Sequence, residues 1–199
     1  RFQNTGQSCI AGKRLLVDAA IADKFVEKLL EKVRALKGGN PKNADTFIGP
    51  MAREDLAIEL EKQVEKTLEE GAKLVIGGKR DKAYYAPTIL TDVTSTMTAF
   101  NEETFGPVLT VTTFDTIEEA IDLSNKSKFG LGVSVFTRDV ESIEKLVYRF
   151  DEGAVFINEL VKSDPRLPFG GIKQSGYGRE LSSHGIREFT NRKTVFINS

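Results

Sequence analysis

Short runs of β-branched and aromatic residues alternate with longer amphipathic segments along most of the chain, and this alternation restricts the possible folds strongly. The clearest amphipathic segment covers residues 20–39, where apolar residues recur at steps of three and four, as on one face of a helix. A second such segment covers residues 53–73 and stops at Gly71. Strand-like runs lie at residues 13–18, 73–78, 84–93 and 107–114. We therefore expect an α/β fold with a mostly parallel sheet and crossover helices.

The later part of the chain continues this pattern. Residues 116–137 and residues 138–158 each read as a helix followed by a strand. Four glycines then fall within nine residues, from Gly170 to Gly178, so this stretch is expected to run as a tight loop.

Composition excludes several classes of protein. The chain has 199 residues, of which 40% are apolar and 29% are charged, which is ordinary for a globular protein with a full core. A net charge of -1, with lysines and glutamates interleaved, argues against binding to nucleic acid or to an anionic membrane. No run approaches the roughly 18 apolar residues of a membrane span. A single cysteine cannot form an internal disulfide, so we expect a cytoplasmic protein.

That cysteine, Cys9, lies in an unusual local sequence. Its neighbours are small and polar, with Gly6 and Gly12 on either side, and Lys13 and Arg14 follow directly. Glycines allow backbone to pass close to a bound molecule, and nearby cations favour the reactive thiolate. The alternative is a small apolar core group, since free cysteines are often buried.

Three motifs, in this order, resemble the NAD(P)-dependent aldehyde dehydrogenase superfamily: FQNTGQSC at residues 2–9, EETFGPV at residues 102–108 and PFGGIKQSGYGRE at residues 168–180. The resemblance implies that Cys9 is the nucleophile. Its thiolate would attack the aldehyde carbonyl to form a thiohemiacetal, which would release hydride to the nicotinamide and leave a thioester for hydrolysis. The backbone N–H of Cys9 would stabilise the oxyanion.

The same resemblance implies roles for four other side chains. Glu103 would hydrogen-bond the nicotinamide ribose, and Phe105 would pack beside the nicotinamide. Phe169 would line the aldehyde tunnel. Ser163 falls where some succinate-semialdehyde dehydrogenases place a serine against the substrate carboxylate, although Gln3 stands where those enzymes carry an arginine.

The role of Asn158 is open, between a place near the catalytic pocket and an amide that fixes its loop.

The resemblance also implies how the chain is organised. Residues 1–190 would form the catalytic domain, and residues 191–199 a C-terminal strand that pairs subunits in a homo-oligomer, dimer or tetramer. The domain that would bind most of NAD or NADP lies upstream in the family, together with an oxyanion-hole asparagine and a water-activating glutamate. We therefore interpret this chain as part of a longer polypeptide and expect no turnover from it alone.

The sequence predicts the catalytic part of an NAD(P)-dependent aldehyde dehydrogenase that acts on a small-molecule aldehyde, with succinate semialdehyde as the expected substrate. No metal site is expected. Alternatives that stay open are a broad aliphatic aldehyde dehydrogenase and a CoA-acylating relative. Alternatives from other classes are a Cys-His hydrolase, which would use His184 as its base, and a non-catalytic structural domain.

Overall fold

The computed structural model describes all residues, 1–199, and divides into two compact units, residues 1–126 and residues 127–199. The elements of the first unit are the 3-10 segments η1 (Gln3–Gly6) and η2 (Ala19–Ile21), the strands β1 (Arg14–Asp18), β2 (Lys73–Ile76), β3 (Arg80–Asp81), β4 (Tyr84–Tyr85), β5 (Thr88–Thr91) and β6 (Val108–Phe114), and the helices α1 (Ala22–Arg34), α2 (Glu54–Glu69), α3 (Thr98–Asn101) and α4 (Ile117–Asn125).

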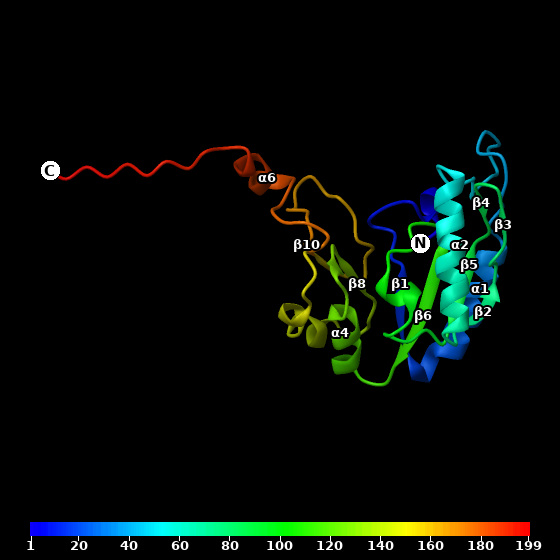
Figure 1. Ribbon diagram of the computed structural model, residues 1–199. Helices are drawn as coiled ribbons and strands as arrows, with labels where there is room; N and C mark the ends of the chain where they lie inside the picture. The colour runs from blue at the N-terminus through cyan, green and yellow to red at the C-terminus, as the bar shows by residue number, and fades with distance from the viewer. The chain divides into compact units, whose positions relative to one another are not determined.

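A four-stranded sheet forms the centre of the first unit, in the order β1-β6-β5-β2 (Figure 1). Strand β6 pairs in parallel with both β1 and β5, whereas β2 pairs antiparallel with β5. The expected α/β fold with a mostly parallel sheet is therefore confirmed.

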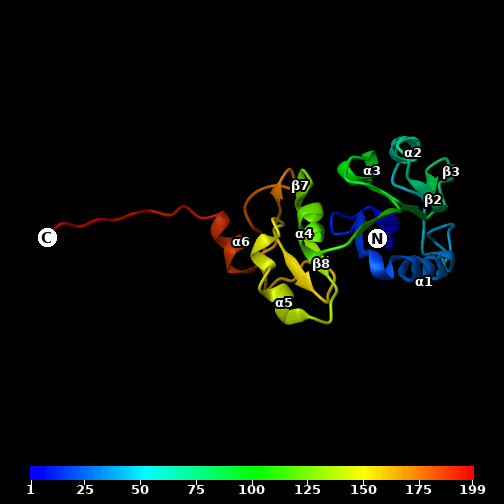
Figure 2. The ribbon, with the colours of Figure 1, turned by 90° about the horizontal axis from the view of Figure 1, so that it is seen from below.

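The two faces of this sheet carry separate apolar cores, because neighbouring residues of a strand point to opposite faces. Leu90 and Val108 pack with Leu60 and Val64 of α2. The adjacent residues of the same strands belong to the other core, with Val33 of α1; these are Ile89 and Leu109. Figure 2 shows α1 and α2 on opposite sides of the sheet. Both helices are amphipathic for this reason.

Helix α2 and the residue that caps its C-terminus hold the short helix α3 in place through two polar side chains. The hydroxyl of Thr67, which is fully buried, donates to the Gln63 carbonyl at 2.7 Å and accepts from the Ala99 N–H at 3.0 Å. The carboxylate of Glu70 accepts from the backbone N–H and the hydroxyl of Thr98, and the backbone bond contributes most to lowering the pKa of this carboxyl. These contacts fix the start of the segment that leads into β6.

The second unit is built from shorter elements. They are β7 (Phe129–Gly130), β8 (Val133–Val135), α5 (Val140–Glu144), η3 (Val147–Arg149), β9 (Val155–Ile157), β10 (Ile172–Lys173) and α6 (Ser182–Glu188). Strands β8 and β9 pair in parallel, and β7 pairs antiparallel with β10. No helix of the protein is long and apolar enough to cross a membrane.

Several expected elements of this unit are divided. The predicted helix after residue 138 breaks into α5 and η3, and the predicted strand after residue 128 breaks into β7 and β8. The glycine-rich stretch from Gly170 to Gly178 is a loop only in part, because the short strand β10 lies within it; the turn that follows has positive φ at Gly176 and Gly178. Residues 191–199 have no regular secondary structure and are exposed, so the subunit-pairing strand stays a prediction.

The buried hydroxyl of Thr67 gives a test of how α3 is held. Replacing Thr67 with Val keeps the shape but leaves the Ala99 N–H without an acceptor, which costs about 1–3 kcal/mol of unfolding free energy. Replacing it with Ser keeps the hydroxyl and is expected to cost less than the Val variant. Urea unfolding of the intact protein measures both, and equal stability of the Val variant and the wild type would contradict this account of α3.

Candidate active site

Cys9 lies in an exposed turn between η1 and β1. The cysteine is free and exposed, and a hydrogen bond from the Ala11 N–H to the Ser8 carbonyl at 3.0 Å closes the turn. The alternative of a buried core cysteine is therefore wrong. The thiol is open to a reacting molecule.

The backbone before this turn is strained. Asn4, Thr5 and Gly6 have φ values of 50°, 55° and 72°. The left-handed region is unfavourable for a β-branched residue such as Thr5, and strain of this kind persists only where the surroundings enforce it. Gln7 supplies part of that enforcement, because its carbonyl accepts from the Asn4 amide at 2.9 Å and its side-chain oxygen accepts from the Ala52 N–H at 2.9 Å.

A second loop, residues 102–107, leads into β6. Its side chains alternate: Glu103 and Phe105 are exposed, whereas Thr104 between them is fully buried. The carboxylate of Glu103 and the ring of Phe105 are therefore both accessible to solvent, whereas the side chain between them is not. The side chain of Gln63 donates to the Glu102 carboxylate at 3.0 Å, which ties the loop to α2.

The two loops touch through glycine. A Cβ added to Gly6 would lie 2.2 Å from the carbonyl oxygen of Gly106, so the two backbones are in direct contact. Each loop feeds one of two adjacent parallel strands, with Arg14 opposite Thr110 in the register of β1 and β6. The chain direction therefore brings the segment with Cys9 and the segment with Phe105 to the same edge of the sheet.

A cation joins the same two loops. The guanidinium of Arg1 donates to the carbonyl of Ala11 at 2.5 Å, to that of Gly106 at 2.5 Å, and to that of Thr104. Burial lowers the pKa of Arg1 to about 10, and the negative charge of Glu103 opposes this shift. Arg1 thus stays charged at neutral pH.

The cations that follow the cysteine have other uses. The Lys13 ammonium donates to the Glu102 carbonyl, which is a further link between the loops. The Arg14 guanidinium donates to the carbonyls of Leu123 and Ser124, both at 2.9 Å, and lies over the ring of Phe100. Arg14 therefore binds the end of α4, a role that the charge pattern alone did not predict.

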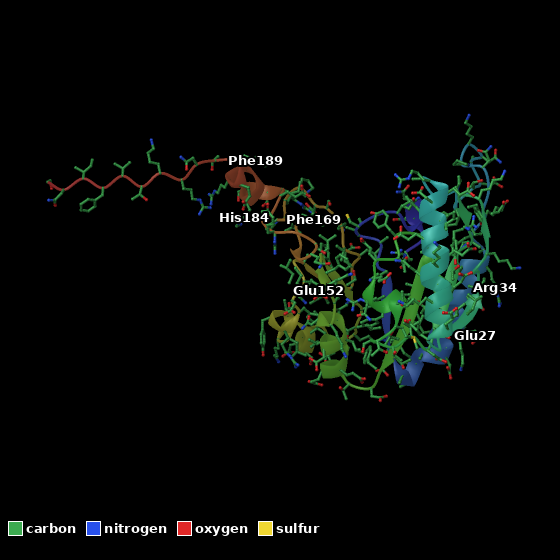
Figure 3. All side chains as sticks on the ribbon, in the orientation of Figure 1. Glu27, Arg34, Glu152, Phe169, His184 and Phe189 are labelled. Carbon is green, nitrogen blue, oxygen red and sulfur yellow. The ribbon has the colours of Figure 1, made fainter.

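The remaining predicted residues belong to the second unit. Phe169 is buried and lines a cavity of about 370 Å³. Ser163 is exposed and is absent from the lining of this cavity, although Lys162 and Asp164 on either side are part of it. Figure 3 labels Phe169 and His184, and His184 is exposed on α6.

Asn158 fixes its loop. Its amide oxygen accepts from the Thr137 N–H and its amide nitrogen donates to the Thr137 carbonyl, both at 2.9 Å. Because both ends of the amide are engaged, the structure supports the role of an amide that fixes its loop over a place near the catalytic pocket.

The loop at residues 102–107 has the groups that a nicotinamide nucleoside needs. An exposed carboxylate accepts hydrogen bonds from ribose hydroxyls, and an exposed ring offers an apolar surface beside it. Glu103 and Phe105 could hold the nicotinamide end of NAD or NADP, and these roles stay predictions. The structure contains no group of three His, Cys, Asp or Glu side chains that could hold a metal ion.

Sequence reasoning missed Arg1 as a member of this site. A cation before an apolar residue is a common surface pattern, and only the spatial approach of the two loops reveals its three carbonyl partners. The contact between Gly6 and Gly106 likewise needed the structure.

Residues 1–195 match the sequence model of the aldehyde dehydrogenase family. The succinate semialdehyde dehydrogenase [NAD(P)+] Sad of Escherichia coli (strain K12) is 47% identical over 199 residues, which cover 98% of this chain and 43% of that protein. A probable succinate-semialdehyde dehydrogenase [NADP(+)] of Synechocystis is 48% identical over 200 residues, which cover 99% of this chain and 44% of that protein. The chain thus spans less than half the length of these relatives.

Solved structures agree with the fold. The betaine aldehyde dehydrogenase of Staphylococcus aureus in complex with NAD+ superposes with a TM-score of 0.89 at 38% identity, covering 93% of this chain and 38% of that one. The glyceraldehyde-3-phosphate dehydrogenase of Methanocaldococcus jannaschii complexed with NADP superposes with a TM-score of 0.90 at 40% identity, covering 98% of this chain and 42% of that one.

The contact between the loops can be tested with two glycines of one segment. An Ala at Gly6 would collide with Gly106 and adopt a left-handed backbone, so we expect a loss of more than about 2 kcal/mol of unfolding free energy. An Ala at Gly12 is the control, because its Cβ would meet no atom within 4 Å. Chemical denaturation of the intact protein compares them, and similar midpoints for the two variants would show that the loops do not touch as described.

Proposed function

The chain belongs to the aldehyde dehydrogenase family, and from that premise we propose that the full-length protein oxidises an aldehyde with NAD or NADP, using Cys9 as nucleophile. The observation that carries this proposal is the contact of Gly6 with Gly106, which joins an exposed thiol loop to the loop with Glu103 and Phe105. A nucleophile and a nucleotide-binding loop must lie together for hydride transfer, so their junction supports this chemistry.

The residues of this chain would act in sequence. The Cys9 thiolate adds to the aldehyde carbonyl, and the backbone N–H of Cys9 donates to the oxyanion of the thiohemiacetal. Glu103 would accept hydrogen bonds from the ribose hydroxyls, and Phe105 would pack beside the nicotinamide. The bound nicotinamide supplies a hydride acceptor. Collapse of the thiohemiacetal transfers its hydrogen with both C–H electrons to that acceptor, and water then cleaves the thioester to the carboxylate and the free thiol.

Succinate semialdehyde is the proposed substrate. Support comes from the names of the two curated relatives quoted above and from the motif at residues 168–180. We assign Phe169 to the wall of the aldehyde pocket and Ser163 to the substrate carboxylate. Because Gln3 carries no charge, this carboxylate would need a further partner. A broad aliphatic aldehyde dehydrogenase is the second candidate, and the neutral side chain of Gln3 is the observation that favours it.

We further propose a cytoplasmic homo-oligomer in which residues 191–199 pair with a second subunit. Three large apolar side chains of this segment support an interface role, because each is more than two-thirds exposed: Val195, Phe196 and Ile197. This chain alone is expected to have no turnover, since it spans less than half the length of its relatives and would contribute only the nicotinamide end of the cofactor site.

The substrate can be tested by the rate of NADH or NADPH formation in the full-length protein. We expect kcat/KM for succinate semialdehyde to exceed that for butanal, a neutral aldehyde of equal chain length, by at least ten-fold, because a carboxylate partner adds binding that butanal lacks. Equal values for the two aldehydes would support the broad aliphatic enzyme instead.

Replacing Cys9 tests the identity of the nucleophile in the same assay. Cys9→Ala is expected to lower kcat by at least a thousand-fold while leaving the Kd for NADH, measured by fluorescence, within about three-fold of the wild type. Activity retained by this variant would contradict the proposed function.

A further inference from the structure

The side chain of Arg1 binds backbone carbonyls on two different loops. One terminal nitrogen, Nη1, donates to the carbonyl of Ala11, two residues after Cys9. The other, Nη2, donates to the carbonyls of Thr104 and Gly106. These last two residues flank Phe105, so one side chain holds the backbone on both sides of that ring and the backbone beside the thiol.

The loop around Phe105 is anchored at its two ends, because the Glu102 N–H donates to the Thr98 carbonyl at 2.8 Å and the Pro107 carbonyl accepts from the Thr88 N–H at 2.9 Å. Between these ends its backbone hydrogen bonds span only two residues, from the Phe105 N–H to the Glu103 carbonyl at 3.1 Å and from the Gly106 N–H to the Thr104 carbonyl at 2.8 Å. Such short turns do not fix a loop against a neighbouring segment. The fork of a guanidinium, with two terminal nitrogens in one plane, can bind carbonyls on both segments at once.

We propose that Arg1 is a positioning residue for the dehydrogenase reaction: it fixes the nicotinamide-binding loop at residues 103–106 relative to the loop that presents Cys9. This inference rests on the proposed function. The guanidinium of Arg1 bonds to backbone carbonyls, so it acts through Phe105, Glu103 and the backbone after Cys9.

The consequence concerns hydride transfer in particular. The distance between the nicotinamide and the carbon bonded to Cys9 depends on how the two loops are held, and a displacement of about 1 Å can cost a hundred-fold in rate. The side-chain hydrogen bonds of Arg1 go to backbone carbonyls of the first unit, whereas Phe169 and Ser163, which we assign to the aldehyde, belong to the second unit. Loss of Arg1 should therefore change kcat and cofactor affinity far more than KM for the aldehyde.

The test uses the full-length protein with Arg1→Met, Arg1→Lys and a control, Arg34→Met. Met matches the length of the stem without a donor, and Lys keeps the charge but offers one nitrogen in place of the fork. Arg34 is an exposed arginine on α1, in the same unit (Figure 3). For each variant, kcat, both KM values, the Kd for NADH and amide hydrogen exchange of the two loops are measured.

We expect Arg1→Met to lower kcat and raise the Kd for NADH by at least ten-fold each, with KM for the aldehyde within three-fold of the wild type. Amides in residues 9–12 and residues 103–106 should exchange at least ten-fold faster, while those of α2 stay unchanged. Arg1→Lys should fall between Met and the wild type, and Arg34→Met should match the wild type.

Wild-type kinetics and cofactor affinity in both Arg1 variants would overturn the proposal, as would faster exchange without any kinetic change. If Arg1→Met does not fold, Arg1→Lys decides, and a Lys variant equal to the wild type overturns it. Failure of the proposed function has a different signature: the wild type would oxidise no aldehyde. In that case the Kd for NADH and the exchange rates still show whether Arg1 holds the two loops in place.

Discussion

The approach of Gly6 to within van der Waals contact of the Gly106 carbonyl is the constraint on which the rest of the site depends. Only a residue without a side chain fits at Gly6, and its positive φ also favours glycine. Arg1 bridges the same junction with a partly buried charge. The strained turn before Cys9 and the loop at residues 102–107 are thereby held together, although about a hundred residues of sequence separate them.

The sheet explains why this junction lies where it does. Strands β1 and β6 are adjacent and parallel, so the segments before them start from one edge. Side chains from α2 and its C-terminal end then hold the second loop. Thr67 and Glu70 hydrogen-bond to residues of α3, and Gln63 hydrogen-bonds to Glu102. The architecture therefore turns two distant motifs into neighbours.

The sequence predicted the parts of this structure that depend on local pattern. Apolar periodicity was sufficient for α1 and α2, since each has one face on a core, and the resemblance identified the motifs around Cys9 and Phe105. Contacts between distant segments could not be predicted in this way. No periodicity indicates that Arg1 would bind three carbonyls or that Arg14 would bind the end of α4, because such roles depend on which loops meet in space.

The most direct measurement of the central claim is mass spectrometry of the full-length protein, quenched during turnover with succinate semialdehyde and NAD or NADP. The account predicts a peptide in which Cys9 carries the acyl group of the thioester, and predicts that this adduct is absent without the cofactor, since the thioester forms only after hydride leaves. Reduced cofactor formed without any acylation of Cys9, or an acyl group on another residue, would contradict it.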